Sequence, residues 1–180
     1  MNKDNSILEL NKFLLKKKYK KILIITGKNS FFKSGAARII GKILELKKTK
    51  FFFKKSYIPE IKELKKIVFV ANKFKPDLIL ALGGGAVIDY SKVVSCVNLQ
   101  EINFRNIFLG KVKYFKRYEL CVVPTTAGSG AEVTSNSVIY INNKKFSFES
   151  PQLIPDNFFL VPSLIYKLKQ TIKSSSGFDA

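Results

Sequence analysis

Two glycine-bearing segments of this 180-residue sequence have residue types suited to binding an anionic ligand. In the first, the apolar residues 78–82 precede three glycines at positions 83–85, and an amphipathic stretch follows. Glycines let backbone N–H groups approach an anion without obstruction by a Cβ atom, and a helix that begins there adds the positive end of its dipole. A pyrophosphate is the natural ligand of such a turn. The alternative is a tight turn that needs glycine for its backbone dihedrals.

The second segment, residues 123–134, combines hydroxyl side chains with small residues. Thr125 and Thr126 can each donate and accept hydrogen bonds, and residues 127–131 offer small side chains against which a flat ring could lie. A flexible polar loop is the alternative interpretation. The segment lacks the GxSxG nucleophile elbow and the sequence has no histidine to act as a base, which argues against a serine hydrolase. The GxGxxG and P-loop motifs are absent as well.

The elements that must position these segments alternate between strand and helix patterns. Buried parallel strands are predicted by β-branched and apolar runs, and helices by apolar residues at helical spacing. The predicted strands cover residues 21–26, 50–54, 78–82 and 119–123, and the predicted helices cover residues 6–18, 31–46, 59–75 and 87–97. Residues 27–30 are predicted to form a turn with Ser30 as N-cap, and residues 137–148 a β-hairpin.

This alternation predicts an α/β fold with an open parallel sheet of Rossmann-like type and one β-hairpin. In such sheets, ligands bind beyond the carboxyl ends of the strands. Both glycine-bearing segments follow a predicted strand, so we expect them to face one crevice and to form a nucleotide-cofactor site. Asp89 falls in the first turn of the helix after the glycines, where the helix dipole alone would favour a carboxylate. A binding role for Asp89 and this purely structural explanation both stay open.

The composition limits the classes of partner. The formal net charge is +19, but it comes mostly from lysine, and the only arginines are Arg38, Arg105 and Arg117. Readers of nucleic-acid sequence favour arginine for its bidentate geometry, so we interpret the lysines as solvated surface and expect no specific nucleic-acid partner. No apolar run approaches the ~20 residues that cross a bilayer. Two cysteines in unrelated contexts, Cys96 and Cys121, suit buried positions in a cytoplasmic protein.

The motifs together resemble a known family. Residues 83–92, GGGAVIDYSK, resemble the GGGSxxDxAK signature of iron-containing alcohol dehydrogenases, and residues 124–134, PTTAGSGAEVT, resemble their PTTAGTGSEVT segment. Residues 145–156 and the GFDA of residues 177–180 resemble later stretches of the family, in the same order. The resemblance implies hydride transfer between a small alcohol and its aldehyde or ketone, with NAD or NADP and a divalent metal, Fe²⁺ or Zn²⁺, that polarises the substrate oxygen.

The resemblance also implies domains and site residues. Residues 1–160 would form the dinucleotide-binding α/β domain, and residues 161–180 would begin a helical metal-binding domain. The implied cofactor-binding residues are Gly27, Gly84, Gly85, Ala86, Asp89, Thr125, Thr126, Ser129, Thr134 and Lys145. Residues 84–86 would hold the pyrophosphate, the threonine-rich segment would flank the adenosine or nicotinamide half, and Thr134 and Lys145 would complete the rim. Asp179 would be the first metal ligand, and a homo-oligomer is possible.

Two departures from the family pattern shape what we expect of this chain. The other metal ligands of the family are histidines, and this sequence has none, so we expect a truncated, inactive fragment without catalytic residues that lacks the helical domain. Gly27 stands where many members have an aspartate that binds the ribose 2′-hydroxyl, which favours NADP or relaxed cofactor choice. The alternative function is a stand-alone nucleotide-binding module without catalysis, and the downstream coding DNA would separate the two.

Overall fold

The computed structural model describes residues 5–16, 18–98, 106 and 111–166, and its centre is a five-stranded parallel sheet. The strand order is β2-β1-β3-β4-β7, and neighbouring strands all pair in parallel. The strands are β1 (Lys21–Gly27), β2 (Lys48–Lys54), β3 (Leu78–Gly83), β4 (Glu119–Pro124) and β7 (Asn157–Phe158). The predicted open parallel α/β sheet is therefore confirmed, with one short strand, β7, that the sequence pattern did not reveal.

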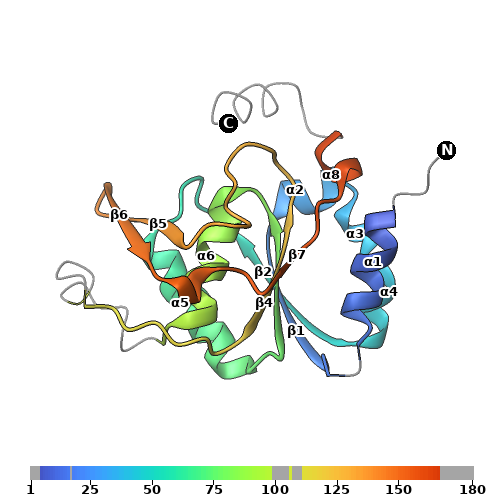
Figure 1. Cartoon of the computed structure of the whole chain (residues 1–180), viewed down its shortest axis with the longest axis horizontal. Helices are drawn as coiled ribbons and strands as arrows, with labels where there is room; N and C mark the ends of the chain where they lie inside the picture. The colour runs from blue at the N-terminus through green and yellow to red at the C-terminus, as the bar shows by residue number, and fades with distance from the viewer. Residues whose placement is uncertain (1–4, 17, 99–105, 107–110, 167–180) are drawn as a thin grey trace.

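Helices cover both faces of the sheet, as Figure 1 shows with the sheet in the centre. On one face lie α5 (Ile61–Phe74), α6 (Gly85–Cys96) and the hairpin of β5 (Asn136–Ile141) and β6 (Lys144–Glu149). The other face is covered by α1 (Asn5–Leu14), α2 (Lys28–Lys33), α3 (Ala36–Ile39), α4 (Gly41–Leu46) and α8 (Pro162–Tyr166). A 3₁₀ turn, η1 (Pro151–Leu153), lies between β6 and β7.

The continuous apolar runs of the central strands follow from this two-sided burial. Alternate residues of β3 enter different cores: Ile79 and Ala81 pack with α5 and α6, whereas Leu78 and Leu80 pack with α1 and its neighbours. All six residues of β3 are buried. A strand that is buried on both faces reads as an unbroken apolar run, which is why these strands were predictable.

Two predictions about residues 27–46 are wrong. The expected turn at residues 27–30 does not form, because β1 continues through Gly27 and α2 begins at Lys28, so Ser30 lies inside a helix and is not an N-cap. The expected single helix over residues 31–46 is three short helices. Gly35 interrupts it with φ of 87°, a left-handed conformation that glycine adopts without steric cost.

The β-hairpin forms as predicted and turns at Asn142 and Asn143. Both residues have positive φ, 49° and 63°, which is the type I′ geometry that matches the twist of the flanking strands. The amide of Tyr140 donates to the carbonyl of Pro59 at 2.7 Å, which attaches the hairpin to the segment before α5. Cys96 and Cys121 are both buried free thiols, as expected. Within the described part of the chain, every helix is too short or too polar to span a bilayer.

Candidate functional site

The two glycine-bearing segments lie side by side at the carboxyl edge of the sheet. Gly83 at the end of β3 pairs with Pro124 at the end of β4, and the amide of Thr125 donates to the carbonyl of Gly83 at 3.0 Å. The two segments expected to face one crevice therefore meet at the carboxyl ends of neighbouring parallel strands, which is where such sheets bind ligands.

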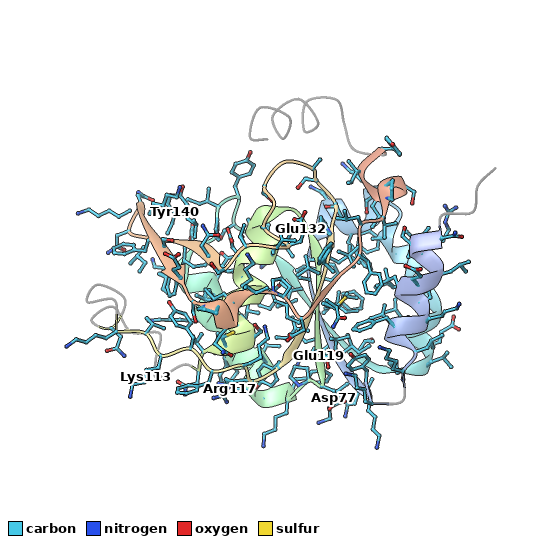
Figure 2. The ribbon with its side chains drawn as sticks, viewed as in Figure 1. Asp77, Lys113, Arg117, Glu119, Glu132 and Tyr140 are labelled. Atoms are coloured by element: carbon cyan, nitrogen blue, oxygen red, sulfur yellow. The ribbon has the colours of Figure 1, made fainter. Side chains whose placement is uncertain are left out.

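The opposite edge of the sheet contains acidic side chains that already have partners. Figure 2 shows Asp77 and Glu119 at the lower end of the sheet, away from Glu132 and Tyr140. The carboxylate of Asp77 accepts from the amides of Lys20 and Lys21, each at 2.8 Å. Glu119 accepts from the Lys18 ammonium at 2.7 Å and from the Tyr19 hydroxyl. These two carboxylates therefore stabilise the loops at the amino ends of the strands, and we do not assign them a catalytic or binding role.

Packing explains the first two glycines of the triglycine bend. A Cβ atom at Gly83 would lie 2.6 Å from Cγ2 of Val87, and one at Gly84 would lie 2.9 Å from Oγ1 of Thr126. Both distances are too short for a side chain. None of the glycines at positions 83–85 has positive φ. The alternative that this bend needs glycine for its dihedrals is therefore wrong, and close approach of other atoms is the reason at positions 83 and 84.

Gly85 is different, because the fold does not require a glycine there. A Cβ atom at this position would meet only the side chain of Ser129, at 3.6 Å, which is an ordinary van der Waals distance. Alanine is the better residue for a helix, by up to about 1 kcal/mol. Gly85 nevertheless begins α6 and lines an open cleft. Its missing side chain leaves space in the cleft beside Ser129.

The N-terminus of α6 also has no cap from a side chain. Gly84 is the N-cap residue, and its carbonyl accepts from the amides of Val87 at 2.9 Å and Ile88 at 3.2 Å. No side chain caps the helix, and its first turn holds no acidic residue. The first amides of a helix have no acceptor within the helix, so this end presents N–H donors and a positive dipole to the cleft.

The cleft has a volume of about 370 Å³, within the range of small-molecule sites. Six residues that the family resemblance implied line it: Gly85, Ala86, Asp89, Thr126, Ser129 and Lys145. The remaining lining residues are Tyr57, Ile58, Pro59, Ala127, Val138 and Tyr140. Most of this second set comes from the loop between β2 and α5 and from the hairpin. Apart from Ala127, which belongs to the threonine-rich segment, no motif marked those residues. The hydrogen bond from the amide of Tyr140 to the carbonyl of Pro59 joins the loop to the hairpin.

Asp89 lies in the cleft and also attaches the hairpin to α6. Burial raises the pKa of its carboxyl group to about 6, against the lowering effects of Lys92, of the Val138 amide that donates to it, and of Lys145. Its backbone carbonyl accepts from the hydroxyl of Ser137 at 2.9 Å. The expectation that Asp89 falls in the first turn of the helix is wrong, because α6 begins at Gly85 and its first turn holds no acidic residue. The helix dipole therefore does not explain this carboxylate, whose side chain instead has a partner, the Val138 amide, on another element.

Lys92, three residues further along α6, is fully buried and has three oxygen acceptors. Its ammonium donates to the carbonyl of Thr134 at 2.8 Å, to the hydroxyl of Thr134 at 2.9 Å and to the carbonyl of Asn136 at 3.0 Å. Burial lowers its pKa to about 8, while Asp89 and Glu132 oppose that shift. No role for Lys92 was predicted, although it is the last residue of the GGGAVIDYSK motif. Thr134 serves this attachment here, and its place on the cofactor rim stays a prediction.

Four of the predicted cofactor-binding residues do not line the cleft: Gly27, Gly84, Thr125 and Thr134. Thr125 is fully buried, and its hydroxyl has no hydrogen-bond partner among the described residues. Gly27 ends β1 and pairs in register with Lys54 of the edge strand β2. Asp179 lies outside the described residues. Within the described residues, no three His, Cys, Asp or Glu side chains gather where they could hold a metal ion.

Comparisons with known proteins agree with this geometry. The sequence model of the iron-containing alcohol dehydrogenase family matches residues 1–162. An alcohol dehydrogenase of Thermococcus barophilus is 30% identical over 128 residues, which cover 67% of this chain and 34% of that protein. The NADH-dependent butanol dehydrogenase A of Thermotoga maritima superposes with a TM-score of 0.83 at 23% identity, over 97% of this chain and 45% of that one.

A sulfoacetaldehyde reductase from Bifidobacterium kashiwanohense, solved in complex with NAD⁺, also has a TM-score of 0.83 at 23% identity, over 98% of this chain and 48% of that chain. At that identity, the two structures show the fold alone. The chain thus spans between a third and a half of the length of these three proteins. The match of the family's sequence model over most of the chain identifies it: the protein belongs to the iron-containing alcohol dehydrogenase family.

Proposed function

We propose that this chain binds NAD or NADP in the cleft between the triglycine bend and the hairpin. The observation that carries the proposal is Gly85, a glycine that neither packing nor dihedrals require, at the uncapped N-terminus of a 12-residue helix. The amides of residues 84–86 would hold the diphosphate, and the exposed Lys145 on the opposite wall would add a positive charge. Thr126 and Ser129 would offer hydroxyls to the ribose groups.

The proposed activity of the whole protein is hydride transfer between a small alcohol and its aldehyde or ketone. The nicotinamide supplies the hydride acceptor or donor, and the residues described here bind and orient it. The family resemblance implies a divalent metal as well, but the described residues do not fit one, since they offer no cluster of ligands. We therefore assign these residues to the cofactor. We also propose the domain division that the resemblance implies. Residues 1–160 would form the cofactor-binding domain, and residues 161–180 would begin the metal-binding domain.

Replacing Gly85 by alanine tests the cofactor site. The Cβ atom of Gly85→Ala would occupy the ligand side of the bend without disturbing the fold, so we expect NADH and NADPH to bind at least tenfold more weakly in isothermal titration. The melting temperature should stay the same or rise, because alanine favours the helix. Since Gly27 offers no carboxylate to repel a 2′-phosphate, NADPH should bind the unmodified chain no more weakly than NADH.

Gly41→Ala is the matched control. Gly41 is also the first residue of a helix, α4, and a Cβ atom there would meet nothing within 4 Å. This variant should bind both dinucleotides as the unmodified chain does. Equal affinity of Gly85→Ala and the unmodified chain would contradict the proposed site, and no binding of either dinucleotide to the unmodified chain would contradict the proposed function.

We further propose that the 180-residue chain alone does not oxidise alcohols or reduce aldehydes. The sequence contains no histidine, and a catalytic metal site normally has three protein ligands. An assay of NADH or NADPH consumption with a set of aldehydes, with and without added Fe²⁺ or Zn²⁺, should show no turnover above the rate without protein. Metal-dependent reduction of an aldehyde would refute this expectation while leaving the cofactor site intact.

A further inference from the structure

Tyr57, on the loop between β2 and α5, is the most exposed large apolar side chain among the described residues. It is 95% exposed, yet it lines the cleft together with Gly85 and Ala86. A ring that is exposed to this degree gains almost nothing from contacts within the chain. Because almost none of its area is removed from water, Tyr57 contributes almost no hydrophobic stabilisation to the free protein. The fold itself gives no reason for an aromatic ring at the mouth of the cleft.

Hydrogen bonds hold the backbone of the loop up to and including Tyr57. Glu63, a buried carboxylate of α5, accepts from the amide of Lys55 at 2.7 Å and from the amide of Ser56 at 3.1 Å. The ammonium of Lys54 donates to the carbonyl of Ser56 at 2.6 Å and to that of Tyr57 at 3.3 Å. The loop therefore presents the ring from a fixed backbone, and burying a carboxylate to achieve this is costly unless it is well paired.

The same loop is fixed again after Tyr57. The hydroxyl of Tyr90 accepts from the amide of Glu60 at 2.5 Å and donates to the carboxylate of Glu63 at 3.1 Å. The carbonyl of Pro59 accepts from Tyr140 of the hairpin. Figure 1 shows the loop after β2 beside the hairpin, on the same side of the sheet as α5 and α6. The loop, the hairpin and α6 thus share one connected network around the cleft.

The cleft has a positively charged part and an uncharged part with an aromatic ring. The N-terminus of α6 and Lys145 are positive and suit a diphosphate, whereas Tyr57 is a neutral ring that faces a cleft with small residues, Ala86 and Ala127, in its lining. A flat ring would fit between an aromatic side chain and such small residues, and aromatic side chains stack on nucleobases in this way.

We propose that Tyr57 stacks on a flat heteroaromatic ring of the bound dinucleotide and so sets the affinity for the ring and not for the diphosphate. The inference rests on the proposed cofactor site and deepens it. The ring is either the adenine or the nicotinamide, which share this chemistry. The contact uses the face of the tyrosine ring and does not need its hydroxyl.

Isothermal titration of the full 180-residue chain and two Tyr57 variants tests the inference. The probes are NADH, NADPH, ADP, nicotinamide mononucleotide and inorganic pyrophosphate. We expect Tyr57→Ala to bind the dinucleotides about tenfold more weakly, and Tyr57→Phe to bind them within twofold of the unmodified chain. Pyrophosphate, which has no ring, should bind all three proteins equally. A loss confined to ADP would assign the adenine, and a loss confined to the mononucleotide would assign the nicotinamide.

Phe69→Ala is the control for loss of an exposed aromatic ring. Phe69 is 56% exposed on α5 and does not line the cleft, so this variant should bind every probe as the unmodified chain does. Equal affinities of Tyr57→Ala and the unmodified chain for the dinucleotides would overturn the inference and leave the cofactor site standing. An equal loss in Tyr57→Ala and Tyr57→Phe would overturn it as well, because the hydroxyl would then be responsible. Failure of the unmodified chain to bind any dinucleotide would overturn both proposals.

Discussion

Asp89 and Lys92 lie on one helix, and burial shifts their pKa values in opposite directions. The carboxyl of Asp89 titrates at about 6 instead of 3.8, and the ammonium of Lys92 at about 8 instead of 10.5. In both cases burial is the largest cause, because it disfavours the charged form. Near neutral pH, both groups are therefore charged at a cost to stability. The chain thus retains two charged groups beside the cleft despite that cost.

The shift at Asp89 predicts how stability depends on pH. Between pH 3.8 and 6, the folded chain binds more protons at this site than the unfolded chain, so its contribution to stability falls as pH rises through that window. The shift of about two pH units corresponds to roughly 3 kcal/mol as an upper bound. Asp89→Asn keeps an acceptor for the Val138 amide without the charge. The free energy of unfolding of Asp89→Asn, minus that of the unmodified chain, should therefore be larger at pH 7.5 than at pH 4.5, which means that the substitution stabilises the fold more at the higher pH.

Urea unfolding at the two pH values measures this difference. Glu149→Gln is the control, because it removes one negative charge from an exposed position on β6 of the same hairpin. Its free energy of unfolding relative to the unmodified chain should change little between the two pH values. If Asp89→Asn behaves as this control does, the raised pKa of Asp89 is wrong.

At the scale of elements, the cleft depends on how α6 is attached to the segments around it. The three hydrogen bonds of Lys92 join α6 to the end of the threonine-rich segment and the start of β5. Lys92→Met keeps the length of the side chain but leaves those three oxygen atoms without their donor. We expect the free energy of unfolding to fall by about 2–4 kcal/mol, since each unsatisfied buried acceptor costs about 1–3 kcal/mol and the loss of a buried charge offsets part of this.

Lys66→Met provides the comparison in the same urea experiment. Lys66 is exposed on α5, and substitutions at such positions change stability by about 0.5 kcal/mol or less. If Lys92→Met is as stable as Lys66→Met, the buried ammonium does not hold α6 to the hairpin segment.

The elements also show what the sequence could and could not predict. Strands β1, β3 and β4 were predictable because both faces of each are buried, so each reads as an apolar run. Strand β7 has only two residues, Asn157 and Phe158, too few for any pattern. The prediction of one helix over residues 31–46 is wrong because the chain breaks at Gly35. A glycine is compatible with either a helix or a break, and the sequence does not show which backbone dihedrals it adopts.

At the scale of the whole molecule, the glycine-bearing wall of the cleft was predictable and the facing wall was not. Each glycine-bearing segment follows its strand directly, so parallel pairing of β3 and β4 was enough to bring the two together. The opposite wall depends on Tyr140, which bonds to Pro59 across 81 positions of the chain (140 − 59 = 81). Such a contact has no local sequence signal. Tyr57 was missed for the same reason, and because exposed aromatic residues on loops are common.

The central claim is that a dinucleotide binds with its diphosphate at the uncapped N-terminus of α6. The most direct test is a titration of the ¹⁵N-labelled chain with NADH and NADPH, followed by amide chemical shifts in NMR; at 20.4 kDa the chain is small enough for backbone assignment. We predict that the amides of Gly84, Gly85 and Ala86 shift most, followed by those of Thr126 and Ser129. Saturable shifts centred on other residues, or no shifts at millimolar ligand, would contradict the account.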